Sequence, residues 1–277
     1  MQVAVAQIDP QLGELERNLA TCVARMEEAA AAGAELIVLP ECAIPGYMFA
    51  GTDEALPYAE EIPGPSTEAL EHEAARLGLY VVCGLLERDG DSLRNAAVLV
   101  GPDGLIGTYR KTHLPFLGVD RFVVPGDALP VFDTPLGRIG IEICYDLRFP
   151  EVTRTLALRG ADIVAHPTNF PMAAKIQTEL ITVARAAENR IYLLTANRVG
   201  KERWGEFCGR SQIVDPYGVR LAETDEHTQT LLVGEVDVEK ARDKDYVIPG
   251  EYELYLFGHR RPELYGALVE ETQAVKV

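Results

Sequence analysis

Short apolar runs that alternate with helical patterns constrain the fold of this 277-residue chain more than any other feature. Val3–Gln7 and Leu36–Leu39 have the composition of buried strands, and Leu15–Ala32 between them has the periodicity of a helix. Ser66–Leu77 repeats the helical pattern and is followed by a third apolar run, Tyr80–Leu86. Strands and helices in this order predict parallel strands that are covered by helices.

Turn signals later in the chain add antiparallel strands to this arrangement. Gly101-Pro102-Asp103-Gly104 joins Arg94–Val100 to Leu105–Tyr109, and further hairpins are expected about Thr134–Gly137 and Asp215–Gly218. The sequence therefore predicts an α/β fold with mixed sheets. The remaining expected elements are helices at Pro150–Arg159 and Lys175–Asn189 and strands at Asp162–His166, Ile191–Ala196 and Thr230–Val236.

No linker rich in glycine or serine divides the chain, so we expect a single domain over residues 1–277. Its core is expected over about 1–240. Residues 241–277 form a C-terminal extension whose Tyr-rich part, Tyr246 to Tyr265, shows little periodicity and is a candidate for a subunit interface.

Charge and composition exclude several classes of protein. With 47% hydrophobic residues the chain is not disordered, and its apolar runs are far shorter than the roughly 18–20 residues that cross a bilayer. Its 26 Lys and Arg face 43 Asp and Glu, a net charge of −17, which argues against nucleic acid as a partner. The acidity indicates a solvated surface, with a cationic substrate or adaptation to high salt as alternatives.

The cysteine and histidine patterns give no sign of disulfides or metal. The number of cysteines is odd, no CxxC pair occurs, and the N-terminus runs directly into a strand-like segment; we therefore expect reduced thiols and a cytoplasmic location. The histidines are scattered without an HExxH arrangement, so no metal and no cofactor are expected. The cysteines are Cys22, Cys42, Cys83, Cys144 and Cys208.

Three segments carry reactive side chains just beyond expected strands. Glu41 follows Leu36-Ile37-Val38-Leu39-Pro40, where partial desolvation would make it a better base. Lys111 follows a strand and enters an aromatic loop, where it could face an oxyanion. Cys144 lies on an expected strand-to-helix turn like that of a nucleophile elbow. Taken singly, each residue has a plainer interpretation as a capping glutamate, a solvated lysine or an inert core cysteine.

Together these segments resemble the nitrilase, or carbon–nitrogen hydrolase, superfamily, whose members share a Glu-Lys-Cys triad in this order. The matching motifs are Leu39-Pro40-Glu41, Tyr109-Arg110-Lys111-Thr112-His113-Leu114 and Cys144-Tyr145-Asp146-Leu147-Arg148-Phe149-Pro150-Glu151. Secondary matches are Pro167-Thr168-Asn169-Phe170, Arg185–Arg190 and Gly209-Arg210-Ser211-Gln212. The resemblance covers roughly residues 1–240.

The resemblance implies an αββα sandwich that dimerises to αββα–αββα, and it assigns roles to residues of this chain. Cys144 would attack an amide-like carbon while Glu41 takes the thiol proton. Lys111 and the backbone N–H of Tyr145 would hold the oxyanion, and water would then hydrolyse a thioester. Larger homo-oligomers than the dimer also occur in the family, and no motif here fixes the size.

Two departures from the family pattern leave choices open. Many members have a second glutamate in the loop after the lysine, and here Asp120 is the candidate substitute, with Glu142 as the less favoured alternative. By motif position, the candidate pocket residues are Tyr47, Phe116, Asn169 and Phe170, although each could equally belong to the core or the rim.

The nucleophile motif reads Cys-Tyr-Asp, not the Cys-Trp-Glu of nitrile-hydrolysing members, so the resemblance implies an amidase. A small aliphatic or omega-amide is the expected substrate. The alternatives are an N-carbamoyl amide hydrolase, then a nitrilase, then a non-catalytic scaffold or binding member of the superfamily. The sequence does not choose the acyl group.

Overall fold

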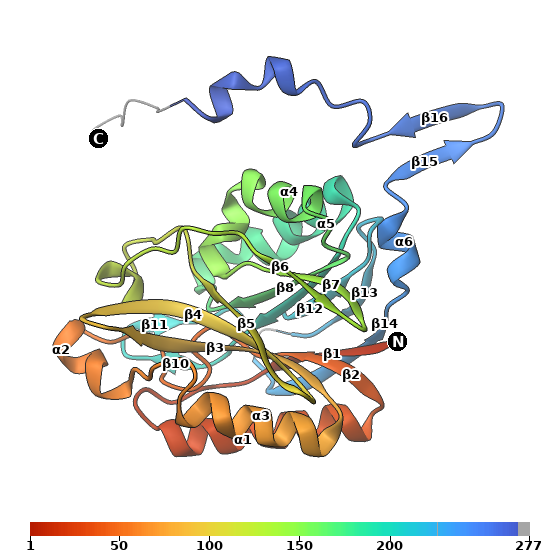
Figure 1. Cartoon of the computed structure of the whole chain (residues 1–277). Coiled ribbons are helices and arrows are strands. Elements are labelled where there is room, and N and C mark those ends of the chain that lie inside the picture. The colour runs from red at the N-terminus through yellow and green to blue at the C-terminus, as the bar shows by residue number, and fades with distance from the viewer. Residues whose placement is uncertain (226, 271–277) are drawn as a thin grey trace. The chain divides into compact units, whose positions relative to one another are not determined.

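The computed structural model describes residues 1–225 and 227–270, and the chain divides into two units, Met1–Arg242 and Asp243–Val277. In the first unit, two six-stranded sheets lie face to face with helices on both outer faces (Figure 1). The layers follow the order of helices α1 and α3, the first sheet, the second sheet, and helices α4 and α5 (Figure 1). This arrangement confirms the αββα sandwich with mixed sheets.

The first sheet has the strand order β14-β1-β2-β3-β4-β5. Strands β1, β2 and β3 are parallel, and the other pairs are antiparallel. Helices α1 (Leu15–Ala31) and α3 (Pro65–Leu77) connect the parallel strands. The strands are β1 (Gln2–Gln7), β2 (Ala34–Val38), β3 (Tyr80–Asp89), β4 (Ser92–Gly101), β5 (Gly104–Arg110) and β14 (Thr230–Glu235).

The second sheet has the order β13-β12-β9-β8-β7-β6, with β7, β8 and β9 parallel. Helices α4 (Pro150–Leu158) and α5 (Thr182–Asn189) connect these parallel strands. The strands are β6 (Val131–Thr134), β7 (Gly137–Ile141), β8 (Ile163–Thr168), β9 (Tyr192–Asn197), β12 (Gln212–Val214) and β13 (Arg220–Glu223).

Parallel pairing brings the carboxyl ends of particular strands to one edge of each sheet. Strand β5 pairs antiparallel with β4, which pairs antiparallel with β3, so β5 runs in the same direction as β2 and β3. The segments that follow β2 and β5 therefore begin at the same end of the first sheet, where the carboxyl ends of these strands lie. Those that follow β7 and β8 likewise begin at one end of the second sheet. Polar side chains just past these strands can meet.

The apolar core of the first sheet lies beneath its helices. Cys22 and Met26 of α1 and Leu70 of α3 are fully buried against strand residues such as Ile37 and Val81. This buried layer fixes where β2 and β3 end, and so where the polar segments begin.

The structure differs from the sequence-based expectations in two places. The helix expected over Lys175–Asn189 is interrupted, because Gln177–Ile181 forms a π-helical turn before α5 begins at Thr182. Several short elements were also not expected, among them α2 (Thr52–Ala55), β10 (Lys201–Glu202), β11 (Gly205–Glu206) and α6 (Val238–Arg242).

The second unit contains a small antiparallel hairpin of β15 (Asp245–Ile248) and β16 (Tyr252–Tyr255). Its ladder lies inside the Tyr-rich segment in which the sequence shows little periodicity. Tyr246 and Tyr252 of the two strands stack, with ring centroids 5.5 Å apart. Across both units, no described helix has the length and apolar composition needed to cross a membrane.

Candidate active site

Glu41 lies three residues beyond β2 in a loop that hydrogen bonds to β3. The Ala43 N–H donates to the Gly84 carbonyl at 2.9 Å, and the Gly84 N–H donates to the Pro40 carbonyl at 3.2 Å. A Cβ atom on Gly84 would lie 2.5 Å from that carbonyl oxygen and 2.6 Å from the Glu41 Cα. Because no real Cβ fits there, Gly84 is what allows the strand to approach the loop and hold it in place.

Lys111 lies between two carboxylates and is the first residue past β5. Its Nζ is 2.6 Å from Glu41 Oε1 and 2.5 Å from Asp120 Oδ2, and all three side chains are 0% exposed. The Lys111 N–H also donates to the Asn95 carbonyl at 2.8 Å, which continues the pairing with β4. The structure thus brings together three of the candidate site residues, Glu41, Lys111 and Asp120.

Two further side chains complete this cluster. Asn95 on β4 donates from Nδ2 to Glu41 Oε1 at 2.7 Å and to Asp120 Oδ1 at 2.8 Å. The Tyr47 hydroxyl donates to Asp120 Oδ2 at 2.7 Å, so Tyr47 holds the second carboxylate and does more than line a pocket. Sequence reasoning missed Asn95, although an asparagine at the start of an apolar strand is unusual enough to be a signal.

Cys144 lies on the turn that follows β7 and has a φ of +48°, in the left-handed region that non-glycine residues rarely occupy. The Asp146 side chain accepts from the Ile143 N–H at 3.0 Å and so braces the turn from within. His166 of β8 lies beneath it, with Nε2 3.3 Å from the Cys144 carbonyl oxygen. Burial lowers the pKa of His166 to about 4, so the ring is neutral and can donate one hydrogen bond to that carbonyl. A backbone in this region is a strained conformation that the surrounding hydrogen bonds hold.

Asp146 also ties the nucleophile turn to the lysine segment. It accepts from the Tyr109 hydroxyl at 2.7 Å, the Thr112 hydroxyl at 2.9 Å and the His113 N–H at 2.9 Å. Burial acts to raise the pKa of Asp146, but hydrogen bonds from His113, Ile143 and Tyr109 hold it below its ordinary value. Residues on both sides of Lys111 are therefore anchored to the carboxylate that braces Cys144.

Electrostatics assign a protonation state to each member of the triad. Burial raises the pKa of the Cys144 thiol, and Glu41 raises it further, so the resting nucleophile is a neutral thiol. Burial would lower the pKa of Lys111, but Asp120 and Glu41 more than offset this and hold that pKa well above its ordinary value. For Glu41, burial raises the pKa despite the opposing effect of Lys111. A carboxylate whose pKa is raised binds a proton more readily than an ordinary carboxylate does.

Comparison with known proteins identifies the family. Residues 2–246 match the carbon–nitrogen hydrolase family. The chain belongs to this family. It is 42% identical over 246 residues to a nitrilase of Pyrococcus abyssi (strain GE5 / Orsay), covering 88% of this chain and 92% of the relative. It is 32% identical over 274 residues to the omega-amidase NIT2 of Bos taurus, covering 94% and 96%.

A solved structure supports the same assignment. A mutant of the amidase from Nesterenkonia sp. AN1 superimposes with a TM-score of 0.76 at 26% identity, over 88% of this chain and 96% of that chain. That structure is described as showing Michael addition of acrylamide at the active site cysteine. The superfamily resemblance and the nitrilase fold predicted from the sequence are thereby confirmed.

The other predicted site residues of this carbon–nitrogen hydrolase lie in different surroundings. Asn169, just past β8, donates from Nδ2 to the Glu41 carbonyl at 2.9 Å and so ties the Glu41 segment to the second sheet. Phe170 is buried with its ring centroid 5.5 Å from that of His166. Phe116 is 89% exposed and lies on the surface, and Tyr145 follows Cys144 in the turn.

Glu142, the alternative second carboxylate, is not part of the Lys111 cluster. It is fully buried, accepts from the Thr153 hydroxyl of α4 at 2.7 Å, and leaves its Oε1 without a partner. Burial raises the pKa of Glu142 to about 8. Its contacts therefore favour Asp120 over Glu142 as the second carboxylate of the site.

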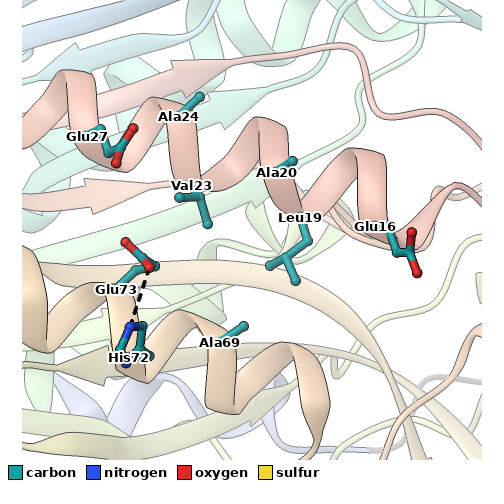
Figure 2. A pocket seen from close by; sticks show the side chains of 9 residues that line it. All are labelled: Glu16, Leu19, Ala20, Val23, Ala24, Glu27, Ala69, His72 and Glu73. Carbon is teal, nitrogen blue, oxygen red and sulfur yellow. Dashed lines mark ion pairs between the residues drawn. The ribbon is translucent and has the colours of Figure 1, made fainter.

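Elsewhere in the described residues, neither a metal-binding cluster nor a second triad is found. No group of three or more His, Cys, Asp or Glu side chains among them is arranged to hold a metal ion. A groove between α1 and α3 is lined by apolar side chains and by Glu16, Glu27, His72 and Glu73 (Figure 2). None of its lining residues is a cysteine or a lysine, so the groove lacks the groups of the triad.

Proposed function

We propose that this protein is a cysteine-dependent amidase that hydrolyses a small aliphatic or omega-amide to a carboxylic acid and ammonia. The observation that carries the proposal is the arrangement of Glu41: its Oε1 is held by Lys111 and Asn95, while its buried Oε2 has no partner. Because Oε1 already accepts hydrogen bonds, Oε2 is the oxygen of Glu41 that can accept a proton. The Cys144 thiol, whose pKa is raised by burial and by Glu41, is a neighbouring group with a proton to give.

In the first step, Cys144 Sγ forms a bond to the amide carbon as its proton passes to Glu41 Oε2. The carbonyl electron pair moves onto oxygen, which becomes an oxyanion. An ammonium has three donors, and two from Lys111 are directed to Glu41 and Asp120, which leaves one for this oxygen together with the Tyr145 N–H. Glu41 then protonates the nitrogen, the C–N bond breaks, and ammonia leaves a thioester.

In the second step, water attacks the thioester carbon as Glu41 takes one of its protons. The same donors hold the second oxyanion. The C–S bond breaks, the proton returns from Glu41 to sulfur, and the acid departs. One carboxylate therefore serves as base and acid twice, which fits a buried group whose pKa is raised toward neutrality.

The omega-amidase relative and the amidase structure support an amide substrate, as does the Cys-Tyr-Asp motif. Nitrile hydrolysis is the second candidate, because the relative with 42% identity is named a nitrilase. An N-carbamoyl amide is a third acyl donor with the same kind of scissile bond. The three differ in the group presented to Cys144, so a substrate panel separates them.

The test is ammonia release by the wild type and by Cys144→Ala over short aliphatic amides, omega-amides of dicarboxylic acids, N-carbamoyl compounds and nitriles. We expect turnover of an amide group by the wild type and none by Cys144→Ala. Cys22→Ala is the matched control, because Cys22 is equally a free, buried cysteine but lies in α1. Its activity is expected to equal that of the wild type.

Residual turnover above a few per cent in Cys144→Ala contradicts the mechanism. Alkylation provides an independent measurement, because Cys144 is 5% exposed and the other four cysteines are 0% exposed. We expect acrylamide to modify Cys144 first, as located by peptide mass spectrometry. A Cys144 that reacts no faster than the others, in a chain that releases no ammonia, favours the non-catalytic scaffold.

Assembly and location form the remaining part of the proposal. The five free cysteines support a reducing, cytoplasmic location, which cell fractionation can check. Exposed apolar side chains on the C-terminal hairpin, among them Val247 and Leu254, support a role for this unit in a homodimer or larger homo-oligomer. A chain ending at Arg242 that assembles and turns over amides as the full chain does would contradict that role.

A further inference from the structure

One amide group joins both carboxylates of the active site. Asn95 is 1% exposed, and its Nδ2 has two N–H donors, one directed to Glu41 Oε1 and one to Asp120 Oδ1. Two carboxylates that share one lysine repel each other. Asn95 supplies each of them with a neutral donor, and a donor to a carboxylate favours its charged form.

The orientation of this amide matters because its two ends are chemically opposite. Rotation by 180° would turn Oδ1 toward two carboxylates and leave three acceptors facing one another. In the observed orientation, Oδ1 instead faces the Cys42 thiol, with Sγ 3.7 Å away. A thiol is a weak donor, so this contact at the oxygen end adds to the preference that the two carboxylates impose at the nitrogen end.

Cys42 is held in place for this contact. It directly follows Glu41, is fully buried, and has a φ of +46°. Such a backbone is uncommon for a residue with a side chain, and the loop that carries it is the one held by Gly84. Burial, together with Glu41 and Asp120, raises the pKa of Cys42, so the thiol keeps its proton for donation.

We propose that Asn95 and Cys42 are positioning residues for the general base. Asn95 fixes Glu41 through Oε1 and leaves Oε2 for the thiol proton of Cys144, and Cys42 keeps the amide in the orientation that allows this. The inference rests on the proposed function, since it gives Glu41 the role of base. It adds a second layer of residues behind the triad, contributed by β4 and by the loop after β2.

The test uses the pH dependence of Cys144 alkylation by acrylamide, which requires no knowledge of the substrate. The Asn95 hydrogen bond lowers the pKa of Glu41, so its removal raises that pKa. In Asn95→Leu, we expect the acidic limb of the rate profile to move to higher pH and the maximal rate to fall about 10- to 100-fold, as expected for loss of a hydrogen bond to a charged group.

A pair of variants at Cys42 isolates the donor from the packing. Cys42→Ala removes the S–H, and we expect a shift of the acidic limb in the same direction and a smaller loss of rate. Cys42→Ser supplies a hydroxyl donor in place of the thiol, and we expect its acidic limb to lie at the same pH as that of the wild type. Cys22→Ala removes an equally buried thiol that lies outside the site, and its limb is expected to stay unchanged.

The outcomes separate this inference from the proposed function. If Cys144 reacts selectively but the limb stays in place in Asn95→Leu and Cys42→Ala, the positioning role is wrong and the amidase mechanism stands. If Cys144 is not selectively alkylated in the wild type, both are wrong. Should Asn95→Leu fail to fold, the comparison of Cys42→Ala with Cys42→Ser decides by itself.

Discussion

One cation between two carboxylates recurs in this molecule, and a surface example can be compared with the set in the active site. On the surface, Arg76 of α3 lies 2.5 Å from Glu27 of α1 and 2.5 Å from Glu73 of its own helix. Both glutamates line the groove between the helices (Figure 2). In the active site, Lys111 lies 2.6 Å from Glu41 and 2.5 Å from Asp120.

The distances between cation and carboxylates are nearly equal in the two sets, so the sets differ in burial and not in geometry. Arg76, Glu27 and Glu73 are 46%, 53% and 17% exposed, whereas the side chains of Lys111, Glu41 and Asp120 are all 0% exposed. Water solvates each surface charge whether or not its partners are present, and exposed ion pairs add little to stability. Water does not solvate a buried charge, so the charges of Lys111, Glu41 and Asp120 are stabilised by one another.

Removing the buried cation is expected to have the largest effect. Lys111→Met keeps the length of the side chain and leaves Glu41 and Asp120 buried without a cation. We expect a rate loss of about 10²–10³ from the missing oxyanion donor and a loss of about 3–5 kcal/mol in the free energy of unfolding. Amide turnover and urea unfolding measure these two quantities.

The matched control for this change is Lys201→Met. Lys201 is 70% exposed and pairs with Glu206 at 3.3 Å, so it combines a lysine with a carboxylate on the surface. We expect turnover and the unfolding midpoint of this variant to match the wild type. A Lys111→Met enzyme that keeps more than about a tenth of its activity would show that the oxyanion is held elsewhere.

Neutralising one of the two buried carboxylates is expected to have a smaller effect. Asp120→Asn preserves the shape of the side chain, but Lys111 then keeps only Glu41 as a charged partner. The asparagine side chain also replaces the charged carboxylate that accepts from the Tyr47 hydroxyl. We expect kcat to fall about 10-fold, which is the size of effect expected for the loss of one hydrogen bond to a charged group. Steady-state kinetics on the best amide provide the measurement.

The conservative control is Asp120→Glu, which restores the charge and adds one methylene. Asp120 occupies the part of the chain where many family members have a glutamate, so we expect Asp120→Glu to retain more activity than Asp120→Asn. The reverse order would mean that Asp120 acts through its shape and not its charge.

The sequence was sufficient to place Glu41, Lys111 and Cys144 just beyond strands, because local motifs and strand direction determine those positions. An asparagine in an apolar strand is a signal that Asn95 has a polar partner, but the sequence could not identify the partners, because Glu41 and Asp120 lie 54 and 25 positions away along the chain. Nothing local in its sequence specifies either contact.

Glu142 shows a second reason why a sequence pattern can misplace a side chain. Two residues apart on a strand, Glu142 and Cys144 would share a face, which made Glu142 a candidate for the site. Strand β7 ends at Ile141, and the positive φ of Cys144 turns the chain, so the alternation no longer applies. The π-helical turn at Gln177–Ile181 was missed for a related reason, because helical periodicity in the sequence does not distinguish it from an α-helix.

Glu142 also provides a buried carboxylate that has no cation as a hydrogen-bonding partner. Its pKa is raised from 4.5 to about 8, so between these pH values the folded state binds more protons than the unfolded state. Stability is therefore expected to fall as pH rises through this interval, by up to about 1.4 kcal/mol per pH unit. In Glu142→Gln the contribution of Glu142 to this slope is expected to disappear, with turnover within about two-fold of the wild type.

Urea unfolding at a series of pH values measures the slope. Glu151→Gln is the control, because Glu151 is exposed on the same helix that Glu142 contacts, and its curve is expected to follow the wild type. A slope that remains unchanged in Glu142→Gln would show that another group titrates in this interval.

Removing the surface cation is expected to have the smallest effect. Arg76→Gln leaves Glu27 and Glu73 solvated, so we expect unchanged kcat and KM and a small decrease in the unfolding temperature. In about 1 M salt, where the screening length is about 3 Å, that decrease is expected to vanish, whereas the effect of Lys111→Met persists because buried charges are screened much less. If Arg76→Gln destabilised the protein as strongly as Lys111→Met, and did so in high salt, then burial would not be what separates the two sets of charges.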